Sequence, residues 1–379
     1  MMNEPLIRVL HITETLSAAG IESFIMNLYR TIDKSRVQFD FFVLRNEKEF
    51  YDAEIENLGG KKYWIQSDKK NTLIKILNES VLLNSFLKTN PYDIVHIHYT
   101  TTLRAPYLFA CKRANVSTRI YHSHSAFVLG KSKFKMLIYE YMKGVIEKNG
   151  TDFFACSEAA AKWIYSENMI NDGKVKVIFN GIDVEKFKFD SDRRLTVRKE
   201  LHIGDEFVII HTGRFLDQKN HEFILDVFNE LLKEDKKAKL LLLGTGELLN
   251  GIKVKVNKLG IDSSVVFLGV KDNVYDYLSA ADCYIMPSLY EGLPVAAVEA
   301  QCSGLPCVFS ENITKEIELT KNVRFLSLNA PISNWVTAVK ESKNLIRGDD
   351  SLVIQKKGYD MRQVALNLQN FYIEASIRK

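Results

Sequence analysis

CYIMPSLYEGLPVAAVEAQCSGLPCV, residues 283–308, combines an apolar strand, a polar loop, a short helix and a second apolar run. The strand is expected at 283–286. The helix is expected from about Pro294, because a proline in the first turn loses no helical hydrogen bond. Gly304 suits the left-handed cap that ends such a helix. The first turn then leaves backbone N–H groups open beside Glu291, which predicts an anion site.

Two carboxylates bracket this helix, Glu291 in the loop before it and Glu299 within it. A carboxylate accepts hydrogen bonds through two oxygens, so it suits a pair of neighbouring hydroxyls on a sugar or a ribose. Gly292 removes a side chain where a ligand would approach the backbone. Together these features predict a ligand that is part phosphate and part polyol. The plain alternative is an ordinary strand–loop–helix turn with solvated glutamates.

The same stretch resembles a family signature. Its pattern, P-S-x-x-E-G-x-P-x-x-x-x-E-A-x-x-x-G-x-P, is similar to the E-x7-E signature of the retaining family 4 glycosyltransferases, which have the two-domain GT-B fold. The matching positions are Pro287, Ser288, Glu291, Gly292, Pro294, Glu299, Ala300, Gly304 and Pro306. The resemblance implies an α/β protein with two Rossmann-like domains, whose parallel sheets face each other across a cleft. It also implies that a nucleotide-sugar donor contacts Glu291, Gly292, Leu293, Pro294, Val295 and Glu299.

Composition limits the class of protein independently of this resemblance. The 379 residues fit two domains, and the 46% apolar and 26% charged content is typical of a globular protein. The net charge of +4 is spread along the chain and no nucleic-acid-binding motif is present, so we expect no nucleic-acid partner. The five cysteines lack metal or disulfide spacing, the N-terminus lacks a signal segment, and no apolar run reaches about 18 residues. These features predict a cytoplasmic protein.

Short apolar runs alternate with helical patterns, which predicts parallel sheets covered by helices. The strands are expected at 7–12, 39–44, 94–98, 119–122, 153–156, 175–179, 207–211, 240–243, 265–268, 283–286 and 306–309. We expect two domains with the polar run 180–205 as the linker, and the resemblance implies that 1–185 binds the acceptor and 186–358 the nucleotide sugar. A final helix within 359–379 is expected to cross back to the first domain, as in related proteins.

In the first domain, candidate ligand contacts follow the predicted strands. Gly20 opens a helix and partly matches the Gly-Gly-x-Glu loop of the family, with Ala19 in place of the first glycine. His122 and His124 end another strand, where side chains face the ligand crevice of an open α/β sheet. In the family a histidine at this place contacts the donor sugar, and we prefer His124 over His122. The alternatives are a plain turn at Gly20 and structural histidines.

In the second domain, Arg214 and Lys219 follow the strand at 207–211. A guanidinium and an ammonium at such a turn suit a diphosphate, and their spacing matches the phosphate-binding pair of the family. A Gly-x-Gly follows the strand at 240–243, but the third glycine of a dinucleotide fingerprint is missing, which argues against a nicotinamide cofactor. The other donor contacts that the resemblance implies are Gly213, Gly244, Val270 and Lys271.

Two further features leave alternatives open. Residues 131–148 form a basic segment with apolar residues at helical spacing. This pattern fits a core helix with a lysine-rich outer face, or a helix in peripheral contact with an anionic membrane. The pair His96 and His98 has the alternate spacing of metal ligands, but no third ligand has a recognisable spacing, so we predict no metal site.

The resemblance implies a retaining hexosyltransferase. It would move a sugar from a nucleoside-diphosphate donor, expected to be a UDP-sugar, to a hydroxyl of a saccharide or lipid-linked acceptor, by analogy in capsule, exopolysaccharide or lipopolysaccharide synthesis. The predicted catalytic residues are Arg214, Lys219, Glu291, His124 and His122. Since the cations would neutralise the departing diphosphate, no metal or other cofactor is expected. The alternatives are an epimerase or a phosphorylase on the same architecture, a non-catalytic sugar-binding protein and a degenerate partner subunit.

Overall fold

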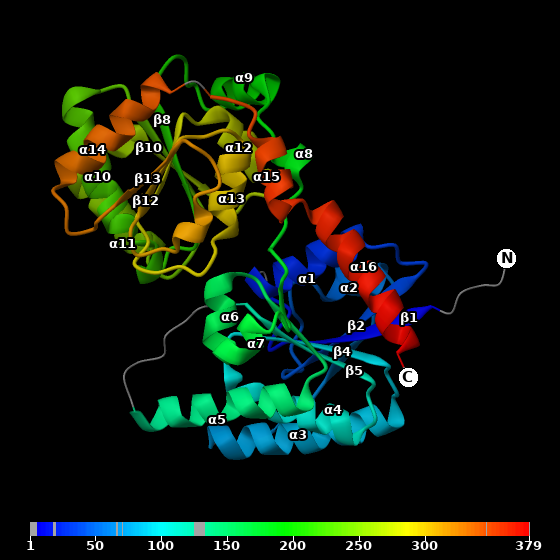
Figure 1. The fold of residues 1–379 in the computed structure, drawn as a ribbon. Helices are drawn as coiled ribbons and strands as arrows, with labels where there is room; N and C mark the ends of the chain where they lie inside the picture. Colours follow the sequence, from blue (N-terminus) through cyan, green and yellow to red (C-terminus); the bar gives the residue numbers. More distant parts are fainter. Residues whose placement is uncertain are drawn as a thin grey trace. The chain divides into compact units, whose positions relative to one another are not determined.

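The computed structural model describes residues 6–17, 20–65, 67–69, 71–124, 133–345 and 347–378. It divides into two units, one formed by residues 1–181 together with 361–379 and the other by residues 182–360. Each unit is built around one parallel sheet (Figure 1). All five cysteines are buried free thiols. Among the described helices, none combines the length and the apolar character that a bilayer crossing requires.

The first unit contains a seven-stranded sheet in the order β3-β2-β1-β4-β5-β6-β7. Its strands are β1 (Ile7–Ile12), β2 (Val37–Val43), β3 (Lys62–Trp64), β4 (Ile94–Tyr99), β5 (Thr118–Ser123), β6 (Asp152–Ala155) and β7 (Val175–Val177). Its helices are α1 (Gly20–Thr31), α2 (Asp52–Asn57), α3 (Thr72–Thr89), α4 (Pro106–Arg113), α5 (Lys133–Asn149), α6 (Glu158–Ile164), α7 (Glu167–Asn171) and α16 (Met361–Ile377). Successive strand residues alternate between two cores, with Leu10 in one and Val9 in the other, because helices cover both faces.

Helix α16 comes from the end of the chain and completes one of these two cores. It packs on α1, β1, β2 and β4, as Figure 1 shows with the last helix in red. Leu368 and Tyr372 are fully buried in the core that also holds Val9. The Gln369 side chain accepts a hydrogen bond of 2.8 Å from the backbone N–H of Asp33. The first sheet therefore depends on residues more than 300 positions away in sequence.

The second unit contains a six-stranded sheet in the order β10-β9-β8-β11-β12-β13. Its strands are β8 (Val208–Thr212), β9 (Lys239–Leu243), β10 (Val265–Gly269), β11 (Cys283–Met286), β12 (Cys307–Ser310) and β13 (Val323–Leu326). Its helices are α8 (Val184–Phe187), α9 (Ser191–Glu200), α10 (His221–Glu234), α11 (Leu249–Leu259), α12 (Val274–Ala280), α13 (Val295–Cys302), α14 (Ile332–Glu341) and α15 (Ser351–Ile354). In both sheets the first strand lies third in the order and the strand order reverses there, which is the Rossmann order.

All predicted strands are present, with ends within two residues of those expected. Two edge strands, β3 and β13, were not predicted. The predicted linker was wrong over most of its length: residues 184–187 and 191–200 fold as α8 and α9 within the second unit. The polar residues of this segment hold α9 in the second unit. Asp190 caps the helix, and Arg194 and Arg198 both bind Asp282 at 2.7 Å.

The basic segment 131–148 falls almost entirely within α5, and this helix is amphipathic. Tyr139 and Ile146 are buried, which confirms a core-facing side. Leu137 and Tyr141, one turn apart, are 70% and 71% exposed. Residues 131 and 132, and the side chains of residues 133–135, lie outside the described part of the chain. Helix α5 thus has both a core side and an exposed apolar side.

Candidate functional site

The predicted site residues of the second unit lie close to the point where the strand order of its sheet reverses, between β8 and β11. Strands β8 and β11 are neighbours in this sheet, although more than 70 residues separate them in sequence. Ligands of open α/β sheets bind outside the carboxyl ends of the strands at such a reversal. The loop after β8 carries Arg214 and Lys219, and the loop after β11 carries Glu291. The fold therefore brings these three residues to one edge of the sheet.

Direct contacts join the two loops. The Lys219 ammonium forms an ion pair with Glu291, with 2.6 Å between Nζ and Oε1. The Gln218 amide donates to the other carboxylate oxygen at 3.1 Å, and its backbone carbonyl accepts from the N–H of Leu289 at 2.8 Å. The Glu291 side chain is only 8% exposed. A carboxylate offers about four lone-pair sites, so Glu291 retains acceptor capacity for a ligand hydroxyl.

Close backbone approach requires two of the predicted glycines. Gly244 has a φ of +132°, and a Cβ at this position would lie 2.0 Å from the carbonyl oxygen of Gly213. A Cβ on Gly213 would lie 3.0 Å from the imidazole of His211 and 3.4 Å from the Lys219 stem. The N–H of Gly244 donates to the carbonyl of Gly269 at 2.8 Å. The ends of β8, β9 and β10 are thereby held together.

Positive groups at this edge are open to a ligand. The Arg214 side chain is exposed, and its guanidinium has no hydrogen bond or ion pair within the described residues. Helix α13 begins at Val295, one residue after the predicted start, and Pro294 is its N-cap. Among the described residues no side chain caps this end, and the first turn holds no acidic residue. The open N–H groups and the guanidinium are both suited to an anion.

Glu299 lies on α13, and burial raises its pKa to about 7. Over the described ranges, its carboxyl has neither a hydrogen bond nor an ion pair. Burial is also the largest cause that raises the pKa of the Tyr284 hydroxyl, and the charges of Glu299 and Glu291 add to it. A partly buried carboxyl without a partner is typical of a ligand-binding group.

The remaining predicted contacts of this unit surround the same edge. Val270 and Lys271 follow β10, where Val270 is 71% exposed and the Lys271 ammonium lies 5.8 Å from the centre of the Tyr277 ring. Gly292 is half-buried and Leu293 is buried between Glu291 and the start of α13. The second unit therefore assembles its predicted phosphate, hydroxyl and base contacts around β8, β9, β10 and β11.

The predicted residues of the first unit form a separate group. Gly20 is the first residue of α1 and is exposed, with open space where a side chain would lie, while Ala19 lies outside the described residues. His122 is fully buried in β5, and His124 follows that strand and is half-buried. The Nδ1 atom of His124 is buried and has no hydrogen-bond partner within the described part of the chain.

Sequence reasoning missed a histidine cluster that includes these residues. His11 of β1 shares a hydrogen bond with His98 of β4, and the imidazoles of His96, His98, His122 and His124 lie beside it. Two triplets have nitrogens within 4.8 Å of one another: His11, His96 and His98, and His98, His122 and His124. The sequence showed no third ligand at a recognisable spacing from His96 and His98, but the fold brings His11, His122 and His124 beside them. The parallel pairing of β1, β4 and β5 places these five histidines together.

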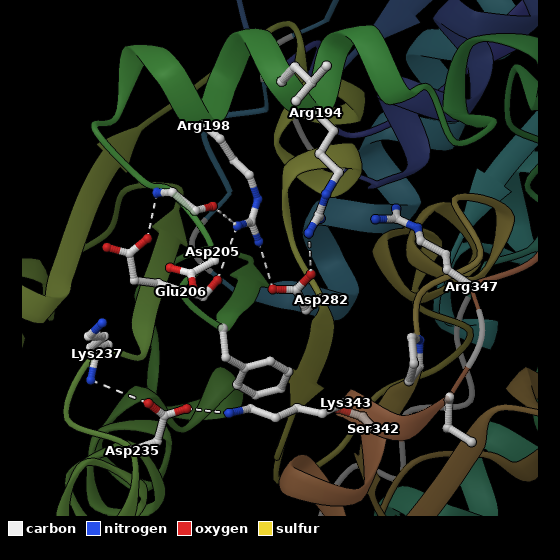
Figure 2. Close-up of a pocket in the computed structure, with 15 residues that line it drawn as sticks. Arg194, Arg198, Asp205, Glu206, Asp235, Lys237, Asp282, Ser342, Lys343 and Arg347 are labelled. Atoms are coloured by element: carbon white, nitrogen blue, oxygen red, sulfur yellow. Dashed lines mark hydrogen bonds and ion pairs between the residues drawn. The ribbon is translucent and has the colours of Figure 1, made fainter.

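A pocket of about 650 Å³ lies at the amino-terminal ends of the strands of the second sheet, beside the residues that precede β8, β11 and β12 (Figure 2). Its arginines are engaged within the unit. Arg194 and Arg198 point from α9 to Asp282, and Arg347 donates to backbone carbonyls, including that of Ser303 at 2.8 Å. These cations tie helices together, so this pocket is a structural junction and not the candidate site.

Comparisons with known proteins agree with this geometry. The description Glycosyltransferase Family 4 matches residues 18–186, and Glycosyl transferases group 1 matches residues 192–326. "Putative glycosyltransferase EpsF" of Bacillus subtilis is 33% identical over 98% of this chain and 97% of its own length. A UDP-Gal:alpha-D-GlcNAc-diphosphoundecaprenol alpha-1,3-galactosyltransferase of Escherichia coli is 27% identical over 81% of this chain and 82% of its own length.

Among solved structures, HepE of Anabaena in complex with UDP superposes with a TM-score of 0.76. The superposition covers 97% of this chain and 100% of HepE at 16% sequence identity, so it supports the fold alone. The two parallel sheets, the two matched family regions and the full-length relative agree. This chain belongs to the glycosyltransferases of the GT-B fold, with a family 4 region followed by a group 1 region.

Proposed function

We propose that this protein is a retaining, metal-independent hexosyltransferase that uses a UDP-sugar. The proposal is carried by the group of residues at the carboxyl ends of β8 and β11, where the strand order of the second sheet reverses. The group consists of the Lys219–Glu291 pair, the exposed Arg214 guanidinium, the open start of α13 and Glu299. The Glu299 carboxyl has no partner within the described residues. This group offers positive charge for a diphosphate and carboxylates for hydroxyls. The UDP in the HepE complex and the UDP-Gal donor of the Escherichia coli relative support the choice of base.

The chemistry follows from these charges. As the bond between the sugar and the diphosphate breaks, negative charge grows on the leaving phosphate oxygens. Arg214, Lys219 and the N–H groups at the start of α13 would stabilise this charge, which is the role that a metal ion plays elsewhere. Glu291 would accept from sugar hydroxyls while it orients the Lys219 ammonium, and Glu299 would accept from the ribose.

In the first unit, His124 is the proposed contact to the donor sugar, with His122 behind it and Gly20 on the loop that opens α1. The acceptor would be a hydroxyl of a saccharide or of a lipid-linked sugar in bacterial cell-surface polysaccharide synthesis. The diphosphoundecaprenol-linked acceptor of the Escherichia coli relative supports a lipid carrier. The exposed Leu137 and Tyr141 of α5 support a peripheral contact with an anionic membrane, where such a carrier would reside.

A donor panel tests the proposal. UDP-, GDP- and ADP-sugars are added to the purified protein and the unfolding temperature is measured, because a ligand that binds the native state raises it. We expect a shift with a UDP-sugar that Arg214→Ala abolishes. Arg324→Ala is the matched control, since it removes an exposed arginine of the same unit that pairs with Glu341. A shift with GDP- or ADP-sugars only, or equal shifts in the two variants, would contradict the assignment.

A further inference from the structure

Five of the eight histidines of the chain lie in one cluster in the first unit. His11, His96, His98 and His122 are fully buried, and His124 is half-buried. Neutral imidazoles are costly to bury without partners, and a charged imidazole more so. The positions of the ring nitrogens therefore decide what this cluster does.

The rings form two hydrogen-bonded chains. In the first chain, His11 Nδ1 lies 2.9 Å from His98 Nε2, and His98 Nδ1 lies 2.9 Å from His124 Nε2. The outer nitrogens of this chain, His11 Nε2 and His124 Nδ1, are buried and have no partner in the described part of the structure. His98 is thus the middle member, with both of its nitrogens engaged by other imidazoles.

The second chain starts from α16. The Tyr372 hydroxyl lies 2.7 Å from His96 Nδ1, and His96 Nε2 lies 3.1 Å from His122 Nδ1. This chain ends at a phenol, whose hydroxyl can donate or accept a hydrogen bond, whereas the first chain consists of imidazoles alone. The two chains lie in one cluster and provide internal controls for each other.

Ring stacking argues for hydrogen bonds and against a metal ion in this cluster. The centres of the His96 and His98 rings are 4.0 Å apart at an interplanar angle of 26°, and those of His122 and His124 are 4.1 Å apart at 31°. Each of the two histidine triplets contains one of these pairs, of which the first is stacked and the second is tilted. Because the lone pair of an imidazole lies in the plane of its ring, two stacked rings do not point at one ion.

The imidazoles of the first chain are neutral. Burial lowers the pKa of His11 and of His124 to about 3, and it lowers the pKa of His98 well below its ordinary value. A neutral imidazole has one N–H donor and one bare acceptor nitrogen. A hydrogen bond between two rings needs one of each, since two hydrogens or two lone pairs facing each other at 2.9 Å repel.

This requirement couples the three rings. If His98 carries its hydrogen on Nε2, it donates to His11 Nδ1, so His11 must carry its own on Nε2. The bare Nδ1 of His98 then accepts from His124, which also carries its hydrogen on Nε2. The opposite choice puts all three hydrogens on Nδ1. Only these two arrangements satisfy both hydrogen bonds.

We propose that His11, His98 and His124 share one tautomer, and that His98 is a positioning residue that fixes whether Nδ1 of His124 donates or accepts a hydrogen bond. This inference rests on the proposed function in one respect, the expectation that Nδ1 of His124 meets a hydroxyl of the donor sugar. His98 would act on the sugar through His124 and would not touch it.

The tautomers are measured directly on the intact protein. Histidine labelled with ¹⁵N in its ring reports for each residue which nitrogen carries the hydrogen, and eight residues are few enough to assign by substitution. We expect His11, His98 and His124 to have the same protonated nitrogen between pH 6.5 and 8, a range at and above the ordinary pKa of about 6.5. A different tautomer in any one of the three would overturn the proposal.

Tyr372→Phe is the matched control for the tautomer measurement. It removes one hydroxyl from the second chain and keeps the ring, so the spectra of His96 and His122 should change. The tautomers of His11 and His124 should stay as they were. Stoichiometric zinc in the purified protein, released together with a change of these tautomers, would also overturn the proposal, because a metal occupies the lone pairs that the hydrogen bonds need.

Two similar substitutions separate positioning from packing. In His98→Asn the side-chain amide sits near the place of Nδ1 and keeps a partner for His124, whereas in His98→Gln the amide reaches the place of Nε2 and His11. We expect His98→Gln to lower kcat with a UDP-sugar about tenfold, the factor for one buried hydrogen bond, and His98→Asn to retain most of it. Equal losses in both variants, with unchanged unfolding temperatures, would refute the positioning role.

These results are distinguishable from failure of the proposed function. If His124→Ala keeps full activity while the three tautomers agree, the role of His124 at the sugar is wrong and the coupled chain stands. If the tautomers disagree while His124→Ala loses activity, the proposed coupling of the three imidazoles is wrong and the proposed function stands.

Discussion

The buried histidines make the first unit sensitive to mild acid. Burial lowers the pKa of each of the five, to about 3 for His11 and His124. The unfolded chain takes up a proton on each imidazole near pH 6.5, whereas the folded unit does not. Below pH 6.5 the unfolded state therefore binds more protons, so the free energy of unfolding must fall as the pH falls.

The magnitude follows from this difference in proton binding. At pH 5.5, one pH unit below the ordinary value, each neutral buried imidazole costs about 1.4 kcal/mol, and five cost about 7 kcal/mol. Glu22, whose pKa burial raises, offsets a part of this loss because the folded unit binds its proton. Typical domains have a free energy of unfolding of about 5–15 kcal/mol. The first unit should therefore be close to unfolding at pH 5.5.

The second unit should respond much less. It contains two histidines with a lowered pKa, His211 and His221, which together cost about 3 kcal/mol at pH 5.5. Glu299 acts in the opposite direction, because its pKa of about 7 lets the folded unit hold a proton that the unfolded chain releases above its ordinary value. The net loss in this unit should be about 1 kcal/mol.

Tryptophan fluorescence distinguishes the two units. Trp64 and Trp163 lie in the first unit, and Trp335 is buried in the second. In Trp335→Phe the two remaining tryptophans report only on the first unit. In the double variant Trp64→Phe, Trp163→Phe the remaining tryptophan reports only on the second unit. Urea unfolding at pH 7.5 and pH 5.5 gives the change in the free energy of unfolding for each unit. Equal changes in the two units, or no change in the first, would show that the five histidines are not buried neutral groups.

Four further outcomes are expected. Arg214→Ala should lower kcat/KM for a UDP-sugar by one to two orders of magnitude, from about 1.5–3 kcal/mol for a charge-assisted bond, and a loss under threefold would contradict its contact with the diphosphate. UDP binding should weaken below pH 7 as Glu299 takes up a proton, and a calorimetric titration of Glu299→Gln should lack that step. Gly244→Ala should lower the unfolding temperature of the second unit, because its Cβ would overlap the carbonyl of Gly213; an unchanged melt would contradict this. EDTA should leave turnover unchanged, and a strict metal requirement would argue against the proposed mechanism.

The sheets were predictable because both of their faces are covered. A strand buried on both sides is apolar throughout, so runs such as 240–243 stand out in the sequence. The edge strands β3 and β13 have one neighbour each and carry Lys62 and Arg324, so their composition does not distinguish them from loops. The charged segment 191–200 was misread for a related reason, since Arg194 and Arg198 bind Asp282 within the second unit.

The site was predictable in residue type but not in its contacts. Spacing and family resemblance placed Lys219 and Glu291 at one ligand, yet their ion pair depends on β8 lying beside β11, which no local pattern encodes. His11 carried no signal of its own, because a single histidine in an apolar strand looks like a core residue. Its partner His98 lies 87 positions away and meets it only through the pairing of β1 with β4.

Helix α16 also sets the order in which the chain matures during synthesis. The second unit, residues 182–360, is complete once its own residues have left the ribosome. The first unit must wait for the last helix, because Tyr372 and Leu368 fill its core and Tyr372 bonds to His96. The half that is translated first is thus finished last, and until then the apolar residues of α1, β1 and β2 that α16 covers stay exposed.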